Sequence, residues 1–139
     1  MTQTITPYLL YSNCEAALDF LSRAFGFEEE LRMTAPEGYV NHAEMRLGDG
    51  RIMLGDPGDE YCGPKQLGGA TFGVYVDVDD VDAHFEQARA AGATISEEPL
   101  DQDYGHRRYG AEDPEGHLWW FARPIAAAAA DEEGATVSA

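Results

Sequence analysis

The feature that most constrains this chain is an internal repeat with an offset of 66 residues (79 − 13). Asn13 suits a helix N-cap, and an apolar stripe at helical spacing follows it and stops at Gly26. The same signals recur at Asp79 or Asp80 and at Gly92, so both helix boundaries return at the same offset. The sequence therefore predicts one helix in each of two copies of one structural unit.

Strand-like runs flank each predicted helix. Runs rich in aromatic and β-branched residues precede the helices, at 8–11 and 72–78. Further extended segments and glycine turns follow them, with strand-like pieces at 39–47, 51–54, 93–95, 107–111 and 117–121. Each half therefore reads as βαβββ, and a unit that exposes an apolar sheet face must pair with its copy.

These patterns predict an α+β fold in a single domain. We expect the domain to span residues 1–124, with modules at about 4–55 and 70–124 and a Gly- and Pro-rich linker at about 56–69. The alanine-rich and acidic end, 125–139, offers no apolar stripe to dock and is predicted to be a flexible tail.

Charge and composition exclude several classes of partner. A net charge of −17 would repel phosphate backbones and anionic lipid heads, so we expect neither nucleic acid nor a membrane as a partner. The chain carries no signal-like start and no run long enough to span a bilayer, which favours a cytoplasmic protein. Cys14 and Cys62 form no disulfide framework; Cys14, at a helix start, is either an activated thiol or, as we favour, a packing residue.

Short motifs in a fixed order carry a resemblance to a known superfamily. They are Val78-Asp79-Asp80-Val81, Ala90-Ala91-Gly92-Ala93 and Asp113-Pro114-Glu115-Gly116-His117. Over roughly residues 4–124, the chain resembles the vicinal oxygen chelate superfamily of glyoxalases, bleomycin-resistance proteins and extradiol dioxygenases. Its first half is especially similar to the branch associated with phosphonate-utilisation operons, on the motifs Pro7-Tyr8-Leu9, Asn13-Cys14-Glu15-Ala16-Ala17, Ala24-Phe25-Gly26 and His42-Ala43-Glu44-Met45.

The resemblance implies a particular architecture and a particular metal site. The two modules would form a curved mixed sheet, or cup, with the helices on its outer face, in a homodimer. The superfamily's usual His and Glu metal ligands would fall at positions where this chain has other residues, namely Thr6 or Tyr8, Met53 or Leu54, Gly73, and Trp120. None of these offers an imidazole or a carboxylate, so we expect no bound metal and no cofactor.

Polar and aromatic residues are then the candidates for lining the cup. Alternation along 39–47 places Ala43, Met45 and Leu47 toward the helices and His42, Glu44 and Arg46 toward the cup. The candidate ligand-binding residues are Tyr8, His42, Arg46, Tyr75, Tyr104, His106, Arg108 and Trp120, and the candidate catalytic residues are His42 and Glu44. The alternatives are a solvated face for the polar set, a surface connector for 103–109, and core packing for at least one of Trp119 and Trp120.

Three classes of function fit these residues. The favoured hypothesis is a metal-independent protein that binds a drug-like or planar small molecule, with sequestration of that molecule as one role. The alternative is a lyase, isomerase or dioxygenase-type enzyme, using metal-free acid–base chemistry or a displaced metal site formed by His42, Glu44 and one of His106 or His117. A third reading is a regulatory or subunit-interaction protein whose own side chains fill the cup, which predicts no ligand-sized cavity.

Overall fold

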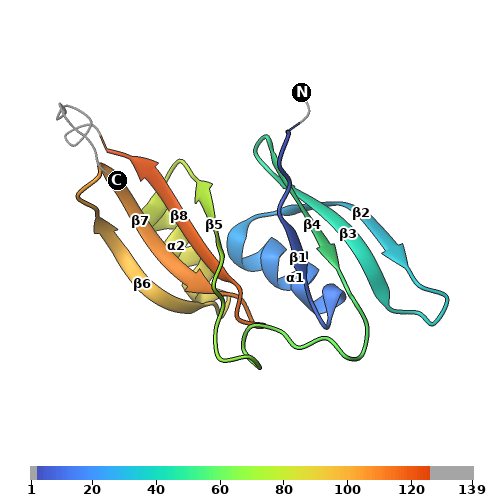
Figure 1. Ribbon diagram of the computed structural model, residues 1–139. Coiled ribbons are helices and arrows are strands. Elements are labelled where there is room, and N and C mark those ends of the chain that lie inside the picture. The colour runs from blue at the N-terminus through green and yellow to red at the C-terminus, as the bar shows by residue number, and fades with distance from the viewer. Residues whose placement is uncertain (1–2, 126–139) are drawn as a thin grey trace.

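The computed structural model describes residues 3–125, which form two βαβββ modules lying side by side (Figure 1). Module 1 contains β1 (Tyr8–Leu10), α1 (Cys14–Phe25), β2 (Glu28–Thr34), β3 (Val40–Leu47) and β4 (Gly50–Gly55). Module 2 contains β5 (Gly73–Asp77), α2 (Val81–Ala90), β6 (Thr94–Asp101), β7 (His106–Glu112) and β8 (Leu118–Pro124). The predicted flexible tail is 125–139, and its residues 126–139 lie outside the described residues.

Each module contributes one four-stranded mixed sheet. The strand orders are β1-β4-β3-β2 and β5-β8-β7-β6; the first pair in each order is parallel and the others are antiparallel. β1 and β5 are the neighbouring edges of the two sheets (Figure 1), yet no strand pairing among residues 3–125 joins them. The predicted α+β class with paired βαβββ modules is confirmed, and the two sheets do not close into a barrel.

Both predicted helices form, and their boundaries follow the capping residues. The Asn13 side chain accepts a hydrogen bond at the start of α1, and Gly26 ends that helix in the left-handed region at φ 84°. Of the two N-cap candidates for α2, Asp80 is the one whose side chain accepts from the helix. The prediction that Gly92 ends α2 is wrong by one residue: the last helical residue is Ala90 and the C-cap is Ala91. Gly92 is the next residue and has a positive φ.

The core is shared between the modules. Phe25 at the end of α1 packs against Trp119 and Phe121 of β8, with ring centroids 5.4 and 4.7 Å apart. All three side chains are fully buried, so the prediction that one of the tryptophans packs in the core is confirmed for Trp119. Burial of each such side chain contributes roughly 1.5–3 kcal/mol relative to exposure. Cys14 is also buried, which raises the pKa of its thiol to about 11 and agrees with packing, not activation.

The turn between β7 and β8 joins module 2 to the end of β1. We call this junction, formed by Tyr11, Asp113, Glu115 and His117, the clasp. Tyr11 donates to Asp113 Oδ2 over 2.6 Å, and Trp119 Nε1 donates to the same oxygen over 3.1 Å. Glu115 accepts from the backbone of Ser12 and Asn13 at the start of α1, and His117 Nε2 lies 2.8 Å from Leu10 O. A motif expected only to turn the chain therefore ties the modules together.

His84 forms a second contact between the modules. Its Nε2 lies 2.9 Å from Phe25 O, a carbonyl that can only accept, so Nε2 carries the proton. Its Nδ1 lies 2.6 Å from the Tyr109 hydroxyl and accepts from it. Burial lowers the pKa of His84, and the bond to Phe25 O opposes this only in part. The neutral ring is the form that stabilises the junction.

This placement predicts a pH-dependent contribution to stability. Because the folded-state pKa lies below the unfolded value of about 6.5, the unfolded chain takes up the proton first as the pH falls. The stabilising contribution of His84 is thus complete above about pH 6.5 and is lost as the pH falls toward the folded-state pKa. Urea unfolding at a series of pH values should give a wild-type advantage over His84→Gln that shrinks on acidification. An advantage independent of pH would contradict this account.

Candidate functional site

The candidate site is the sheet face opposite the helices, which we call the cup face. On β3, Ala43 and Met45 are fully buried toward the helices, while His42 and Glu44 on the other side keep a quarter of their side-chain surface exposed. The predicted alternation is therefore confirmed. By strand register, the cup face carries Tyr8, His42, Glu44, Arg46 and Met53 in module 1, and Gly73, Tyr75, Arg108, Gly110 and Trp120 in module 2.

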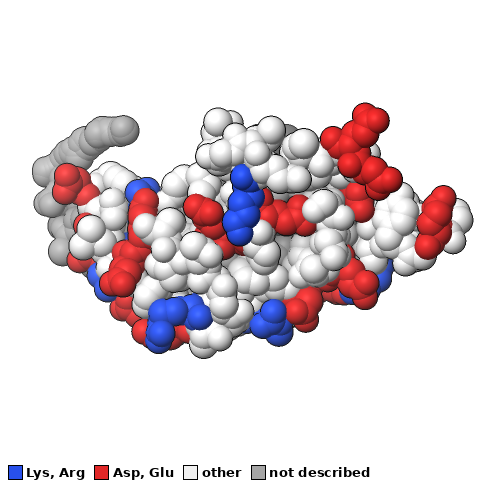
Figure 2. Space-filling view, turned by 90° about the horizontal axis from the view of Figure 1, so that it is seen from below, with Lys and Arg blue, Asp and Glu red and all other residues white. Residues whose placement is uncertain are grey.

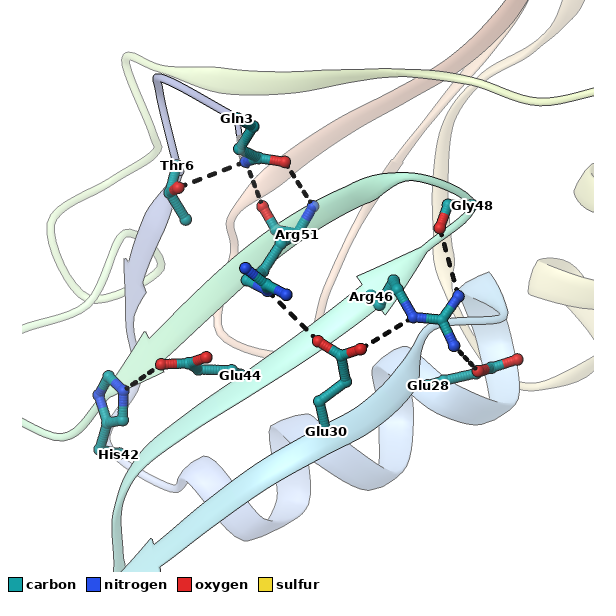
Figure 3. A network of polar contacts seen from close by, with 9 residues as sticks. All are labelled: Gln3, Thr6, Glu28, Glu30, His42, Glu44, Arg46, Gly48 and Arg51. Atoms are coloured by element: carbon teal, nitrogen blue, oxygen red, sulfur yellow. Dashed lines mark hydrogen bonds and ion pairs between the residues drawn. The ribbon is translucent and has the colours of Figure 1, made fainter. Parts of the chain in front are cut away.

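In module 1, carboxylates of β2 form ion pairs with the arginines of the cup face (Figure 3). Arg46 donates to Glu28 over 2.6 Å and to Glu30 over 2.9 Å, and Glu30 also accepts from Arg51 over 3.3 Å. These contacts lower the pKa of Glu30, chiefly through the bond from Arg46. Arg46, predicted to bind ligand, is thus neutralised by its own strand neighbours and can reach a ligand only by exchanging partners.

His42 and Glu44 form a polar pair of their own, farther along β3 from Arg46 (Figure 3). His42 Nε2 lies 3.3 Å from Glu44 Oε2, and the Tyr8 ring meets the His42 ring edge-on at a centroid distance of 6.0 Å. When Nε2 donates to this carboxylate, Nδ1 is left as a hydrogen-bond acceptor. The three predicted residues therefore lie together, in an arrangement able to accept a proton.

In module 2, the Trp120 indole lies against glycine backbone on both neighbouring strands. A Cβ on Gly73 of β5 would lie 2.2 Å from Trp120 Cζ3, and one on Gly110 of β7 would lie 3.1 Å from Cδ1. Side chains at these two positions would push the ring off the sheet. Tyr8 uses the same device in module 1, because a Cβ on Gly55 would lie 2.4 Å from its hydroxyl oxygen. Each module thus lays a flat aromatic ring on its cup face.

The predicted residues of module 2 form one connected network. The Tyr75 hydroxyl lies 2.8 Å from the Tyr104 hydroxyl and 2.8 Å from His106 Nδ1. Arg108 donates to Tyr104 over 3.0 Å, and its guanidinium lies 5.6 Å from the centroid of the Trp120 ring. Burial and the neighbouring Tyr104 raise the pKa of Tyr75. Of the predicted cluster at 103–109, Tyr104, His106 and Arg108 therefore lie at the cup face. Arg107 instead pairs with Asp82 of α2, and Tyr109 is buried in the core.

Glu97 of β6 completes this network and was not predicted from the sequence. Its carboxylate accepts from Arg108 over 3.1 and 3.3 Å and from Trp120 Nε1 over 3.4 Å. The bidentate contact fixes the guanidinium over the indole ring. Gly110 was missed as well, although its place on the same face as Arg108 follows from alternation along 107–111.

The residues at the superfamily's metal positions do not fit a divalent ion. Tyr8 pairs with Met53 in the register of β1 and β4. In that of β5 and β8, Trp120 pairs with Tyr75, whereas Gly73, the position predicted from the sequence, pairs with Leu118 and offers no side chain. Phenol, thioether and indole are poor ligands for such an ion. Within residues 3–125 no group of three or more His, Cys, Asp or Glu side chains could hold a metal. The displaced site with His42, Glu44 and either His106 or His117 is therefore not assembled.

A shallow apolar groove, open to solvent, borders the cup face where β1 approaches module 2. It has a volume of about 350 Å³ and is lined by Tyr8, Leu10, Tyr61, Leu67 and Phe72, among others. A volume of this size matches the lower range of small-molecule pockets. The third hypothesis, in which the chain's own side chains fill the cup, predicted no ligand-sized space, and this groove at the edge of the cup counts against it.

The face of the molecule seen from below carries more acidic than basic side chains (Figure 2). In the view from below, acidic side chains extend over both halves of the molecule and outnumber the basic ones (Figure 2). Neither helix in the described part of the chain has the length and hydrophobicity needed to cross a bilayer.

Comparisons with known proteins agree on one family. The sequence model of the Glyoxalase/Bleomycin resistance protein/Dioxygenase superfamily matches residues 4–121. An uncharacterised Mycobacterium tuberculosis (strain ATCC 25618 / H37Rv) protein, Rv0887c, is 34% identical over 139 residues, covering 96% of this chain and 82% of its own.

Solved structures show the same fold. TioX from Micromonospora sp. ML1 is 38% identical with a TM-score of 0.72, covering 89% of this chain and 100% of its own. The fosfomycin resistance protein FosX from Listeria monocytogenes shares the fold, at 18% identity and a TM-score of 0.64, covering 88% of this chain and 93% of its own.

Proposed function

We propose that this chain, which belongs to the Glyoxalase/Bleomycin resistance protein/Dioxygenase superfamily, binds a planar, largely apolar small molecule on its cup face without a metal ion. The observation that carries the proposal is the Trp120 indole laid flat across Gly73 and Gly110. A ring held in this way is ordered before a ligand arrives, so stacking on it costs little conformational entropy. Aromatic stacking adds about 0.5–1.5 kcal/mol beyond the area that it buries.

The polar groups around the indole favour ligand recognition through oriented hydrogen bonds over attraction of a charged ligand. Arg46 and Arg108 are already paired with carboxylates, so the cup offers an anionic ligand no unpaired guanidinium on these two residues. Apolar area and a few oriented hydrogen bonds are then the main sources of affinity. The fold is shared with FosX, a fosfomycin resistance protein, which supports the choice of a small-molecule ligand.

The oligomeric state, the branch of the superfamily and the cellular location of the protein are also part of this proposal. We infer a homodimer, because a second copy would cover apolar side chains exposed on the strands and turns around the cup, including Leu31, Met33, Phe72 and Leu100. The resemblance to the phosphonate-operon branch and the cytoplasmic location stay predictions from the sequence.

Binding of acridone, a planar tricyclic fluorophore, tests the proposal directly. We expect saturable binding with one acridone per cup, quenching of tryptophan fluorescence, and the same affinity after dialysis against EDTA. The metal content of protein purified without an affinity tag should stay far below one ion per cup. A stoichiometric divalent ion whose removal abolishes binding would overturn the metal-free reading, and a complete lack of saturable binding would contradict the binder.

A second candidate is metal-free acid–base catalysis, which the contact between His42 and Glu44 favours. The carboxylate orients the imidazole and leaves Nδ1 able to accept a proton from a bound substrate. A turnover activity that disappears in His42→Ala, with the fold intact, would identify the chain as an enzyme of this kind.

A further inference from the structure

The module-2 network contains a chain of hydrogen bonds with a defined direction. An arginine side chain can only donate, so Arg108 Nη1 donates to the Tyr104 hydroxyl oxygen over 3.0 Å. The Tyr104 proton is then available for Tyr75, 2.8 Å away, and the Tyr75 proton for His106 Nδ1, also 2.8 Å away. In this order each hydroxyl accepts one hydrogen bond and donates one.

The opposite direction is less favourable. It would require Tyr104 to accept from both Arg108 and Tyr75 while its own proton points away from the chain. Hydrogen bonds in a head-to-tail chain polarise one another, and a hydroxyl that accepts from a cation becomes a better donor. The guanidinium, itself held by Glu97, therefore sets the direction of the whole chain.

The direction fixes the tautomer of His106. A neutral imidazole that accepts at Nδ1 carries its proton on Nε2. Nε2 of His106 has no partner within residues 3–125, and the residue lies on the same face of β7 as Arg108 and Gly110. The cup face of module 2 therefore presents an oriented N–H donor beside the aromatic rings of Tyr75 and Tyr104, whose centroids lie 5.8 and 5.1 Å from that of His106.

We propose that His106 Nε2–H is a specificity-determining donor that selects ligands carrying a carbonyl or phenolate oxygen at the edge of a planar ring. The inference rests on the proposed function and narrows it to a ligand class. The relay of Arg108, Tyr104 and Tyr75 acts as a positioning device, since these residues orient the donor through His106. A planar hydrocarbon can stack in the same cup but leaves the donor unsatisfied.

Two measurements on the full chain test this inference. Long-range ¹H–¹⁵N correlation spectra of the ligand-free protein should show His106 protonated at Nε2. Tyr75→Phe should shift the population toward a mixture of tautomers, because Nδ1 loses its donor. Tyr39→Phe, a change at an exposed tyrosine outside the network, should leave the spectrum as it is. A wild-type His106 protonated at Nδ1 would overturn the inference.

Ligand selection is tested with two planar bicyclic probes, coumarin, which has a ring carbonyl, and naphthalene, which has none. We expect coumarin to bind about tenfold more tightly, the effect of one hydrogen bond, and His106→Phe to abolish this preference. Equal affinities in the wild type would overturn the inference and leave the binder intact. Failure of both probes to bind would count against the proposed function itself, whereas the tautomer spectra judge the relay separately.

Discussion

Replacing Asp113 by alanine is expected to lower the free energy of unfolding by about 3 kcal/mol or more. The carboxylate is 2% exposed and accepts from Tyr11, from Trp119 Nε1 and from two backbone N–H groups of its own turn. Its removal leaves a buried phenol and a buried indole N–H without an acceptor, and each unsatisfied group costs about 1–3 kcal/mol. Equilibrium unfolding in urea measures the loss.

Two variants control this result. Tyr11→Phe removes only one of the bonds to Asp113 and should cost less than Asp113→Ala. Asp103→Ala, an exposed aspartate, should change stability by no more than about 0.5 kcal/mol. An Asp113→Ala protein as stable as the Asp103→Ala protein would show that the clasp does not hold the modules together.

The largest expected effect on binding follows from Gly73→Ala. The new Cβ would lie 2.2 Å from Trp120 Cζ3, a distance that real Cβ atoms do not adopt, so the indole must turn away from the sheet. Loss of the stacking surface should weaken acridone binding at least about tenfold. Fluorescence titration measures the affinity, and the emission of Trp120 should change along with it.

Gly50→Ala is the matched control for this change. Gly50 also lies on a strand, and a Cβ there meets nothing closer than Leu47 O at 3.5 Å, an ordinary contact. We expect its acridone affinity to equal that of the wild type. Unchanged binding in Gly73→Ala, with the fold intact, would mean that the ligand does not use the indole.

Most of the architecture was accessible from the sequence because its signals are local. Capping by Asn13 and termination at Gly26 fix α1 without reference to the rest of the chain. The sequence predicted the number of strands but did not locate the edge strand β2. It located the other edge strand, β6, only at its start, 93–95. β2 is exposed along its whole length, and its charged sequence lacks the apolar alternation of a half-buried strand. β6 carries Pro99, which demotes a strand signal and is tolerated at a sheet edge.

The candidate site was predictable as a set of residues but not as a set of contacts. Tyr75, Tyr104, His106, Arg108 and Trp120 were all named from their types and positions, and they lie in one network. Glu97 was missed because its strand was not located. The clasp was missed because Asp113 and Tyr11 are 102 positions apart, and turn chemistry says nothing about a partner at that distance.

The seam between β1 and β5 has a consequence for how such a chain adapts. No backbone ladder among residues 3–125 crosses it, so the angle between the two sheets depends on side chains, chiefly those at Asp113, Glu115 and His84. Substitutions there can widen or narrow the space above the sheets while every strand keeps its register. Selection for wider or narrower ligands can therefore act on side chains at the junction of the modules and leave unchanged the residues that touch the ligand.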